Sequence, residues 1–336
     1  MTIIYAILIF LVLIFVHEFG HFITAKACGV KVNEFALGMG PAIFKKQKGE
    51  TLYALRIFPV GGYCAMEGED EDSDHPRAFN NQPAWQRAIV LAAGSLMNLL
   101  TCVVLLIIIA FWAGQPTTTL EKIEPGSPAE AAGLLPGDQI VQIDDTKISN
   151  WDDVIQSIGS SDGETAELTI IRDGEEMELT TDLEYNKEQK RNMIGISPTS
   201  ERHLVGSVGA GIKNTGKMAV MMYDTLRQLF TGDVSVKELS GPVGIVYAVN
   251  VSAQSGIMYV VYLAALLSLN LAIINMLPFP ALDGGRLLFL LIRKVTGKRV
   301  TDEMEGRIHF IGIMLLFALM IYVTFNDVIR FIVPIF

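Results

Sequence analysis

The sequence predicts an α-helical membrane protein with four spans, a small α+β domain and a membrane-associated β-sheet. Of its 336 residues, 51% are hydrophobic and only 18% are charged, whereas soluble domains average about 25% charged residues. Four apolar stretches of at least 18 residues lie along the chain. Charge is also uneven, because residues 114–257 carry 11 Lys and Arg against 22 Asp and Glu in a chain whose net charge is −10. One acidic, soluble-looking segment therefore interrupts an otherwise apolar protein.

Each apolar stretch is long enough to cross a bilayer. A helix rises about 1.5 Å per residue, so about 20 residues cross a hydrocarbon core of about 30 Å. Four buried helices of a soluble fold are the alternative, but apolar runs of this length are rare there. The first stretch lacks a basic leader and a small-residue cleavage site, so we expect it to be retained. The stretches are Ile3–Ala25, Ala88–Trp112, Ile257–Leu277 and Ile308–Phe325.

The basic residues of the loops predict the orientation of the spans. Loop 26–87 carries eight Lys and Arg and loop 284–307 carries six, whereas the C-terminal tail has only Arg330 and the N-terminal tail has none. Because basic loops stay in the cytoplasm, both termini and the acidic segment are expected outside. His17 lies about 21 Å along the first helix from its outer end, so chemistry at this residue is expected nearer the cytoplasmic side.

The acidic segment predicts a folded α+β domain. Its stretch EPGSPAEAAGLLPGD, residues 124–138, predicts a short helix that starts at Ser127 or Pro128 and ends at Gly133. A strand, a helix and a hairpin closed by Asp173-Gly174 follow. The stretch resembles PDZ domains of the bacterial protease-associated type, in which PGSPAxxAGLxPGD recurs. That resemblance implies binding of a substrate C-terminus or a size filter that excludes uncut ectodomains, and it favours the filter.

Two further regions are expected beside the spans. Residues 30–65 contain three strand-like runs separated by glycine-containing turns, which predicts a small antiparallel sheet on the cytoplasmic side. It is either a plain surface hairpin or an edge that pairs with an extended peptide. Residues 210–230 predict an amphipathic helix, which lies on the outer membrane surface or packs as a soluble helix.

The motif HEFGH, residues 17–21, carries the most specific chemical signal. Positions i and i+4 share one face of a helix, so His17 and His21 can bind one Zn²⁺ ion. Glu18 is then placed to accept a proton from metal-bound water. Ionisable side chains within a span are costly and usually functional, and a divalent cation would compensate for three of them. A hydrogen-bonded cluster without metal is the alternative.

The stretch NMLPFPALDGG, residues 275–285, offers a third metal ligand. A hydrolytic zinc site usually has three protein ligands and one water, and residues 22–28 contain no further His. Two prolines and two glycines break the third span beside Asp283, and broken backbone at membrane depth needs protein or a water cavity around it. Asp283 is therefore expected to be a ligand, or else the N-cap of a following helix. Glu34 is closer in sequence but lies beyond a predicted break.

Together, these motifs and their order resemble the site-2 protease family of intramembrane zinc metalloproteases, and most nearly the bacterial RseP/RasP-type regulated intramembrane proteases. The resemblance implies that Glu18 is the catalytic base and that a single Zn²⁺ is the cofactor. The metal ligands that it implies are His17, His21 and Asp283. The substrate-binding residues assigned to the broken third span are Asn275, Pro278 and Pro280.

The resemblance also implies partners and a location. Single-pass membrane proteins are the expected substrates, such as anti-sigma factors or leftover signal peptides, cleaved within or near their spans in the lipid bilayer of a bacterial inner membrane. The acidic net charge argues against a nucleic-acid partner, and three scattered cysteines do not make a disulfide scaffold. The alternatives are a non-catalytic membrane PDZ scaffold and a zinc transporter or sensor, but binding alone does not require Glu18.

Eight segments follow from these expectations. They are the first span with HEFGH (1–29), the cytoplasmic-side sheet and loop (30–87), the second span (88–113), the PDZ-like extracytoplasmic domain (114–190), the amphipathic surface helix and linker (191–256), the third span with NxxPxPxLDG (257–283), a cytoplasmic loop or helix (284–307), and the fourth span and tail (308–336).

Overall fold

The computed structural model describes residues 2–69, 73–161, 163–235, 238–296 and 302–332. The chain forms two compact units, one built from residues 1–109 and 211–336 and the other from residues 110–210. Residues 297–301 of the expected cytoplasmic loop and residues 333–336 of the expected tail lie outside the described residues.

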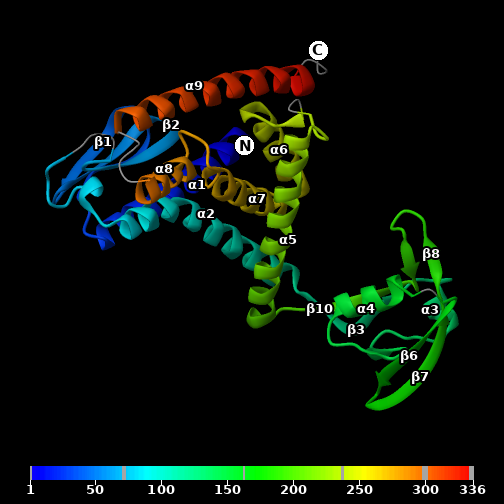
Figure 1. The fold of residues 1–336 in the computed structure, drawn as a ribbon. Helices are drawn as coiled ribbons and strands as arrows, with labels where there is room; N and C mark the ends of the chain where they lie inside the picture. The colour runs from blue at the N-terminus through cyan, green and yellow to red at the C-terminus, as the bar shows by residue number, and fades with distance from the viewer. Residues whose placement is uncertain (1, 70–72, 162, 236–237, 297–301, 333–336) are drawn as a thin grey trace. The chain divides into compact units, whose positions relative to one another are not determined.

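Four helices of the first unit are long and apolar enough to cross a membrane, which confirms the predicted four-span class (Figure 1). At most 28% of any of their apolar windows is buried inside the protein, so most of this apolar surface is available to lipid. The helices are α1 (Thr2–Ala27), α2 (Ala84–Ala113), α7 (Ile257–Asn275) and α9 (Asp302–Asp327).

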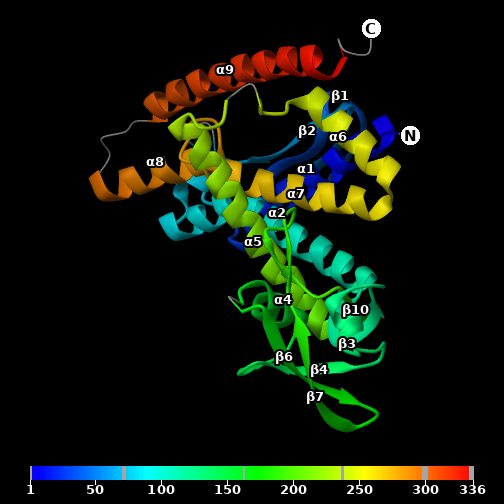
Figure 2. The same ribbon diagram turned by 90° about the vertical axis from the view of Figure 1, so that its right-hand side faces the viewer.

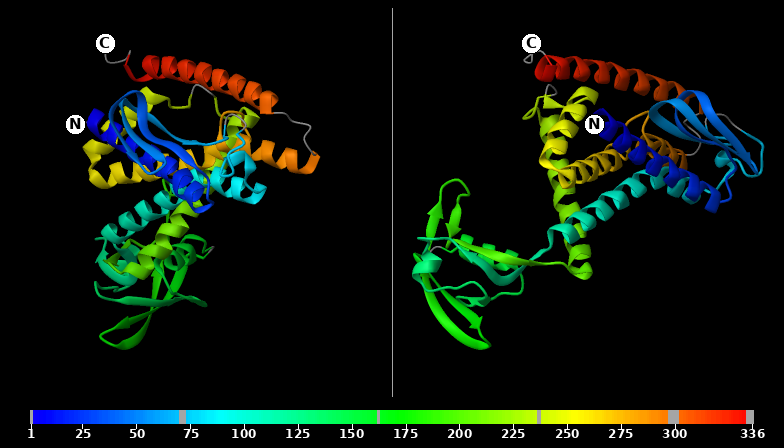
Figure 3. Two further views of the ribbon diagram at one scale, coloured as in Figure 1. Left: turned by 90° about the vertical axis from the view of Figure 1, so that its left-hand side faces the viewer. Right: turned by 180° about the vertical axis from the view of Figure 1, so that it is seen from behind.

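A membrane-associated sheet packs beside the first span. Strands β1 (Val32–Lys48) and β2 (Thr51–Met66) form a two-stranded sheet that lies along α1 (Figure 3). One buried core joins α1, both strands, α2 and helix α8 (Asp283–Thr296). Its buried members are Ala25, Val30, Val32, Phe35, Cys64, Met66, Phe79, Val90, Leu91 and Leu290.

The register of the sheet gives it two different edges. Residues 34–37 have partners both in 52–55 and in 62–65, so this part of β1 lies inside the sheet. The end of β1, residues 42–48, pairs with residues 51–56. The two edges are therefore the stretch 62–66 and the stretch 42–48.

The expected linker before the third span is largely helical. Helix α5 runs over Leu204–Thr231 and α6 over Pro242–Ser255. Helices α6 and α7 pack against the first half of α1 around one apolar cluster (Figure 2). The buried carboxylate of Asp327 on α9 accepts hydrogen bonds from the backbone N–H groups of Gly241 and Gly244, at 2.9 and 2.7 Å. It thereby caps the N-terminus of α6, whose donors would otherwise be unpaired.

The second unit is an α+β domain. Its main sheet has the order β10-β3-β4-β6-β7, with β5 paired to β4, and α4 packs on its apolar face. Strands β9 and β10 lie beyond the expected domain limit at residue 190, because β10 pairs with β3 at the start of the domain. Its elements are β3 (Gln115–Ile123), α3 (Pro128–Ala131), β4 (Gln139–Ile143), β5 (Thr146–Lys147), α4 (Trp151–Gly159), β6 (Thr165–Arg172), β7 (Glu175–Asp182), β8 (Glu184–Asn186), β9 (Arg191–Met193) and β10 (Ile196–Glu201).

Local signals of the sequence define this domain. Ser127 caps α3 and Asn150 caps α4 through a capping box. Asp173 and Gly174 both have positive φ and close the β6–β7 hairpin. Burial raises the pKa of the Asp138 carboxyl, but hydrogen bonds from Arg172 and from the Leu135 N–H outweigh it and hold that pKa below its usual range.

Candidate metal centre

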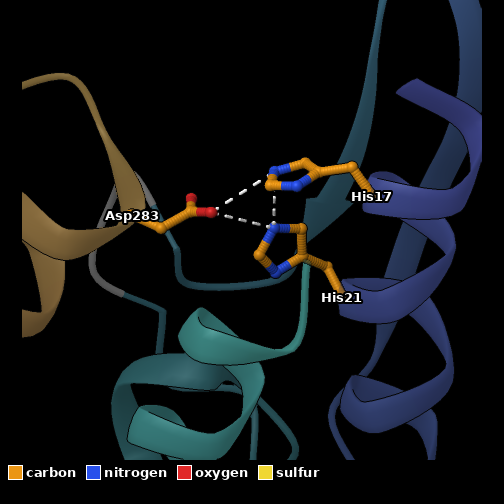
Figure 4. A group of neighbouring side chains, drawn as sticks. All are labelled: His17, His21 and Asp283. Atoms are coloured by element: carbon orange, nitrogen blue, oxygen red, sulfur yellow. Dashed lines mark hydrogen bonds and ion pairs between the residues drawn. The ribbon is translucent and has the colours of Figure 1, made fainter. Parts of the chain in front are cut away.

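Three side chains from two distant parts of the chain converge on one point (Figure 4). His17 and His21 lie one turn apart on α1, and Asp283 opens α8. The Nε2 atoms of the two imidazoles are 3.3 Å apart. The Asp283 Oδ2 atom lies 3.3 Å from His17 Nε2 and 3.4 Å from His21 Nε2. Among the described residues, these three form the one group of His, Cys, Asp and Glu with metal-site spacing.

The spacing fits a small tetrahedral cation. Zinc lies about 2.0–2.2 Å from nitrogen and oxygen ligands, which places tetrahedral ligand atoms about 3.3 Å apart. All three observed separations have this value to within about 0.1 Å. The Asp283 Oδ2 atom is buried and accepts no hydrogen bond within the described part of the chain, and such an atom is costly unless a cation neutralises it. Three ligands leave a fourth tetrahedral position for water.

The outer nitrogen atoms of both imidazoles have partners of their own. His21 Nδ1 lies 2.8 Å from the Val90 carbonyl oxygen on α2, so Nδ1 carries the proton and Nε2 presents its lone pair to the metal position. His17 Nδ1 lies 3.4 Å from the amide of Asn98, which is fully buried. The Ser268 hydroxyl of α7 donates to the backbone carbonyl oxygen of Asn98 at 2.8 Å. Such partners fix the ring orientation of metal-binding histidines.

Gly94 on α2 makes room for both imidazoles, a role that was not predicted from the sequence. A Cβ atom at this position would collide with His21 Nε2 and would lie 2.7 and 2.8 Å from His17 Cε1 and Nδ1. Gly20 on α1 has the matching role, since a Cβ there would lie within 3 Å of Met97 and of the Ala93 backbone. The close approach of α1 to α2 therefore depends on these two glycines. Their positions on facing helices give no signal in one sequence.

Glu18 lies beside the metal position without being part of the ligand group. It interacts electrostatically with His17, His21 and Asp283, and its carboxylate accepts a hydrogen bond from the Cys64 N–H of β2. A Cβ at Gly62 would lie 3.2 Å from Glu18 Cγ. The Cys64 side chain is buried and does not belong to the ligand group.

The break in the third span has the predicted position. Helix α7 ends at Asn275, whose amide Nδ2 lies 3.5 Å from His17 Nε2. Pro278 is exposed at the mouth of an apolar groove between α2 and α8, and Pro280 packs against Gly312 of α9. A Cβ at Gly284 would collide with the carbonyl oxygens of residues 276 and 277. This glycine therefore lets α8 begin directly against the broken segment and so positions Asp283.

Glu34 and two further histidines, His203 and His309, lie outside the centre. Glu34 forms an ion pair with Arg56 at 2.6 Å. His203 accepts a hydrogen bond from the Gly206 N–H at 3.0 Å and caps the start of α5. His309 accepts one from the Ala281 N–H at 2.8 Å. None of the three belongs to the ligand group.

Comparisons with known proteins agree on one family. The model of peptidase family M50 matches residues 5–319. A protein of Clostridium acetobutylicum named as a candidate zinc metalloprotease is 39% identical over 330 residues, which cover 98% of this chain and 97% of the relative. The zinc metalloprotease RasP of Geobacillus kaustophilus is 32% identical and covers 98% of both chains. The PDZ domain of an SdrC-like protein from Listeria monocytogenes is 20% identical, with a TM-score of 0.23, and covers 25% of this chain and 88% of that domain.

Replacing Gly94 by Ala should weaken metal binding. The added methyl group meets both imidazoles, so the His rings must tilt away from Asp283. We expect zinc affinity, measured by competition with a chromogenic chelator, to fall at least about 10-fold. Gly216→Ala on α5 is the matched control, because its Cβ would meet nothing within 4 Å. Equal affinity of the two variants would contradict the crowding argument.

Proposed function

The chain belongs to peptidase family M50 and is an intramembrane zinc metalloprotease, and we propose that His17, His21 and Asp283 hold its zinc while Glu18 is the catalytic base. The observation that supports this assignment is the set of three ligand-atom separations of 3.3–3.4 Å. The family assignment replaces the scaffold and transporter alternatives.

The residues around the centre suit peptide hydrolysis. When bound, zinc acidifies a water molecule and polarises the scissile carbonyl. Glu18, held by the Cys64 N–H, takes the proton of that water and later delivers it to the leaving amine. Asn275, at 3.5 Å from His17 Nε2, is close enough to donate its amide hydrogen to a substrate carbonyl. Pro278 and Pro280 keep the chain after Asn275 non-helical, so the substrate side of the centre stays open.

The active site is proposed to face the cytoplasmic side of a bacterial inner membrane. The two basic loops, 26–87 and 284–307, would both stay inside. An ion pair between Glu69 of the first loop and Arg286 of the second supports this placement, because it joins them on one side of the helices. Both termini and the PDZ-like domain would then be outside.

We propose that the substrate backbone lies along the sheet edge formed by residues 62–66. A transmembrane helix satisfies its own amides and must unwind before cleavage. Pairing with an exposed strand replaces part of the lost hydrogen bonding. Of the two sheet edges, this one supports the proposal, because Gly62 and Cys64 both lie against Glu18. Single-pass membrane proteins fit such main-chain recognition, and anti-sigma factors or signal-peptide remnants are the classes suggested by the family resemblance.

For the PDZ-like domain we propose capture of an extended peptide. An apolar groove runs between α4 and residues 193–196, and β10, which begins there, is an edge strand of the sheet. An apolar groove beside a free edge is what strand addition requires. This feature favours capture over the size filter, which needs no groove.

Glu18→Gln should stop proteolysis and spare the metal. The amide cannot accept a proton but keeps the size of the side chain, and Glu18 is not among the three ligands. We expect cleavage of a single-pass model substrate to fall about 10²–10⁴-fold with one zinc per chain retained. Asp283→Asn is the companion variant and should lose zinc as well as activity. Undiminished cleavage by the Glu18 variant would reject its role as base.

Photocrosslinking distinguishes the two sheet edges. A photoreactive phenylalanine analogue at Tyr63 replaces an aromatic residue of the 62–66 edge, and the same analogue at Phe44 does so at the 42–48 edge. In the Glu18→Gln background, we expect the model substrate to crosslink to position 63 and not to position 44. Crosslinking from position 44 but not from position 63 would place the substrate on the 42–48 edge and would contradict the proposal.

A charge in the groove tests the role of the PDZ-like domain. Ile155 lines the groove and is 37% exposed, so Ile155→Asp should leave the domain folded. Under capture, cleavage of a substrate with a trimmed ectodomain should slow about 10-fold, which corresponds to about 1.4 kcal/mol of binding. Gln156→Asp, exposed on the same helix, is the control. If Ile155→Asp cleaves trimmed and untrimmed substrates at the wild-type rates, the filter is the better description.

A further inference from the structure

Residue Ala281, two positions before Asp283, has an unusual backbone conformation. Its φ is +79°, in the left-handed region that alanine rarely adopts. The other described non-glycine residues with positive φ are Asp144, Asp173 and Lys190, all in the PDZ-like unit. A strained residue of this kind persists only when its surroundings hold it. The question is therefore what holds Ala281.

A histidine of the fourth span supplies the contact. The Ala281 N–H donates to His309 Nδ1 at 2.8 Å. A backbone N–H can only donate, so His309 Nδ1 must carry a lone pair and the ring proton must sit on Nε2. That Nε2 faces Glu305, one turn earlier on α9, at 3.6 Å. The ring also packs on Phe289 of α8, with centroids 5.6 Å apart.

Neighbouring contacts join the same helix to the same segment. Gly312, one turn after His309, is buried against Pro280, and a Cβ at Gly312 would lie 2.7 Å from Pro280 Cβ. Glu305 also pairs with Arg293 at the end of α8 at 2.5 Å. The start of α9 thus contacts the chain on both sides of Asp283. The fourth span contributes no metal ligand within the described residues.

We propose that His309 is a positioning residue for the metal centre, which fixes the Ala281 backbone and through it the Asp283 carboxylate. This inference rests on the proposed zinc site and adds a residue that touches neither metal nor substrate. Losing the acceptor would let Ala281 relax to negative φ and would swing the start of α8. Asp283 would then no longer meet the two imidazoles at 3.3–3.4 Å.

The test compares side chains with and without a hydrogen-bond acceptor at position 309, and then relieves the backbone strain at position 281. His309→Leu removes the acceptor, and zinc affinity should fall about 10–100-fold. His309→Asn keeps an oxygen near the place of Nδ1, so its affinity should stay within about threefold of wild type. The decisive variant is the double change His309→Leu with Ala281→Gly. Glycine adopts positive φ without strain, so it should recover at least about 10-fold of the lost affinity, whereas a mere packing role of His309 would not be rescued.

A second readout needs neither zinc nor activity. In the metal-free, full-length protein, hydrogen exchange of the peptide covering residues 276–285 should be faster in His309→Leu than in wild type. Phe310→Leu, an exposed neighbour on α9, is the control and should match wild type in both measurements. Wild-type zinc affinity in His309→Leu, or no rescue by Ala281→Gly, would overturn the proposal. The Asp283→Asn variant distinguishes this result from failure of the proposed zinc site. If the zinc site is wrong, Asp283→Asn binds zinc as tightly as wild type; if only the His309 proposal is wrong, Asp283→Asn still loses zinc.

Discussion

Three lone pairs that meet at one point are the constraint on which this structure depends. Two imidazole nitrogens and one carboxylate oxygen lie 3.3–3.4 Å apart, closer than such acceptors approach without a proton or a cation between them. In a protein interior, an unpaired carboxylate oxygen carries a large desolvation cost. A divalent cation offsets that cost and at the same time gains its ligands. The same atoms that would destabilise the site without a cation would therefore favour a small tetrahedral ion in it.

The helices are arranged so that these atoms can meet. His17 and His21 require α1 and α2 to approach closely, which Gly20 on α1 and Gly94 on α2 allow. Asp283, the ligand proposed on α8, needs a chain that leaves the helical path, which residues 276–282 between α7 and α8 provide. Backbone of this kind at membrane depth must be covered by protein. Helix α9 supplies part of the cover through His309 and Gly312, so the fourth span has a role beyond anchoring.

The sequence predicted which residues carry the chemistry better than it predicted how they are held in space. The HEFGH spacing places both imidazoles on one face because helix periodicity is local, and the prolines and glycines of residues 275–285 mark the break for the same reason. Asp283 could be chosen by chemistry, but its meeting with α1 depends on tertiary packing. The contacts of Gly94 and His309 are made between helices, so no local pattern predicts them. Ala281 was missed since alanine is not a residue expected at positive φ. Strand β10 was missed because its partner, β3, lies at the other end of the domain.

On the proposed substrate path, the edge strand beside Glu18 would have two roles that limit each other, since it would contact the catalytic carboxylate and also pair with the substrate backbone. Along a strand, successive backbone N–H groups point to opposite sides. The N–H of Cys64 faces Glu18, and residues 62–65 keep one regular register with β1. Gly62 lies two positions before Cys64 in this register, so its N–H turns to the same side, where it would be the donor offered to the proposed substrate. An edge that offers so few main-chain hydrogen bonds would not discriminate between substrates by their side chains. If the substrate follows this edge, selectivity would come from which membrane segments unwind beside it, and from a separate contact such as the groove of the PDZ-like domain.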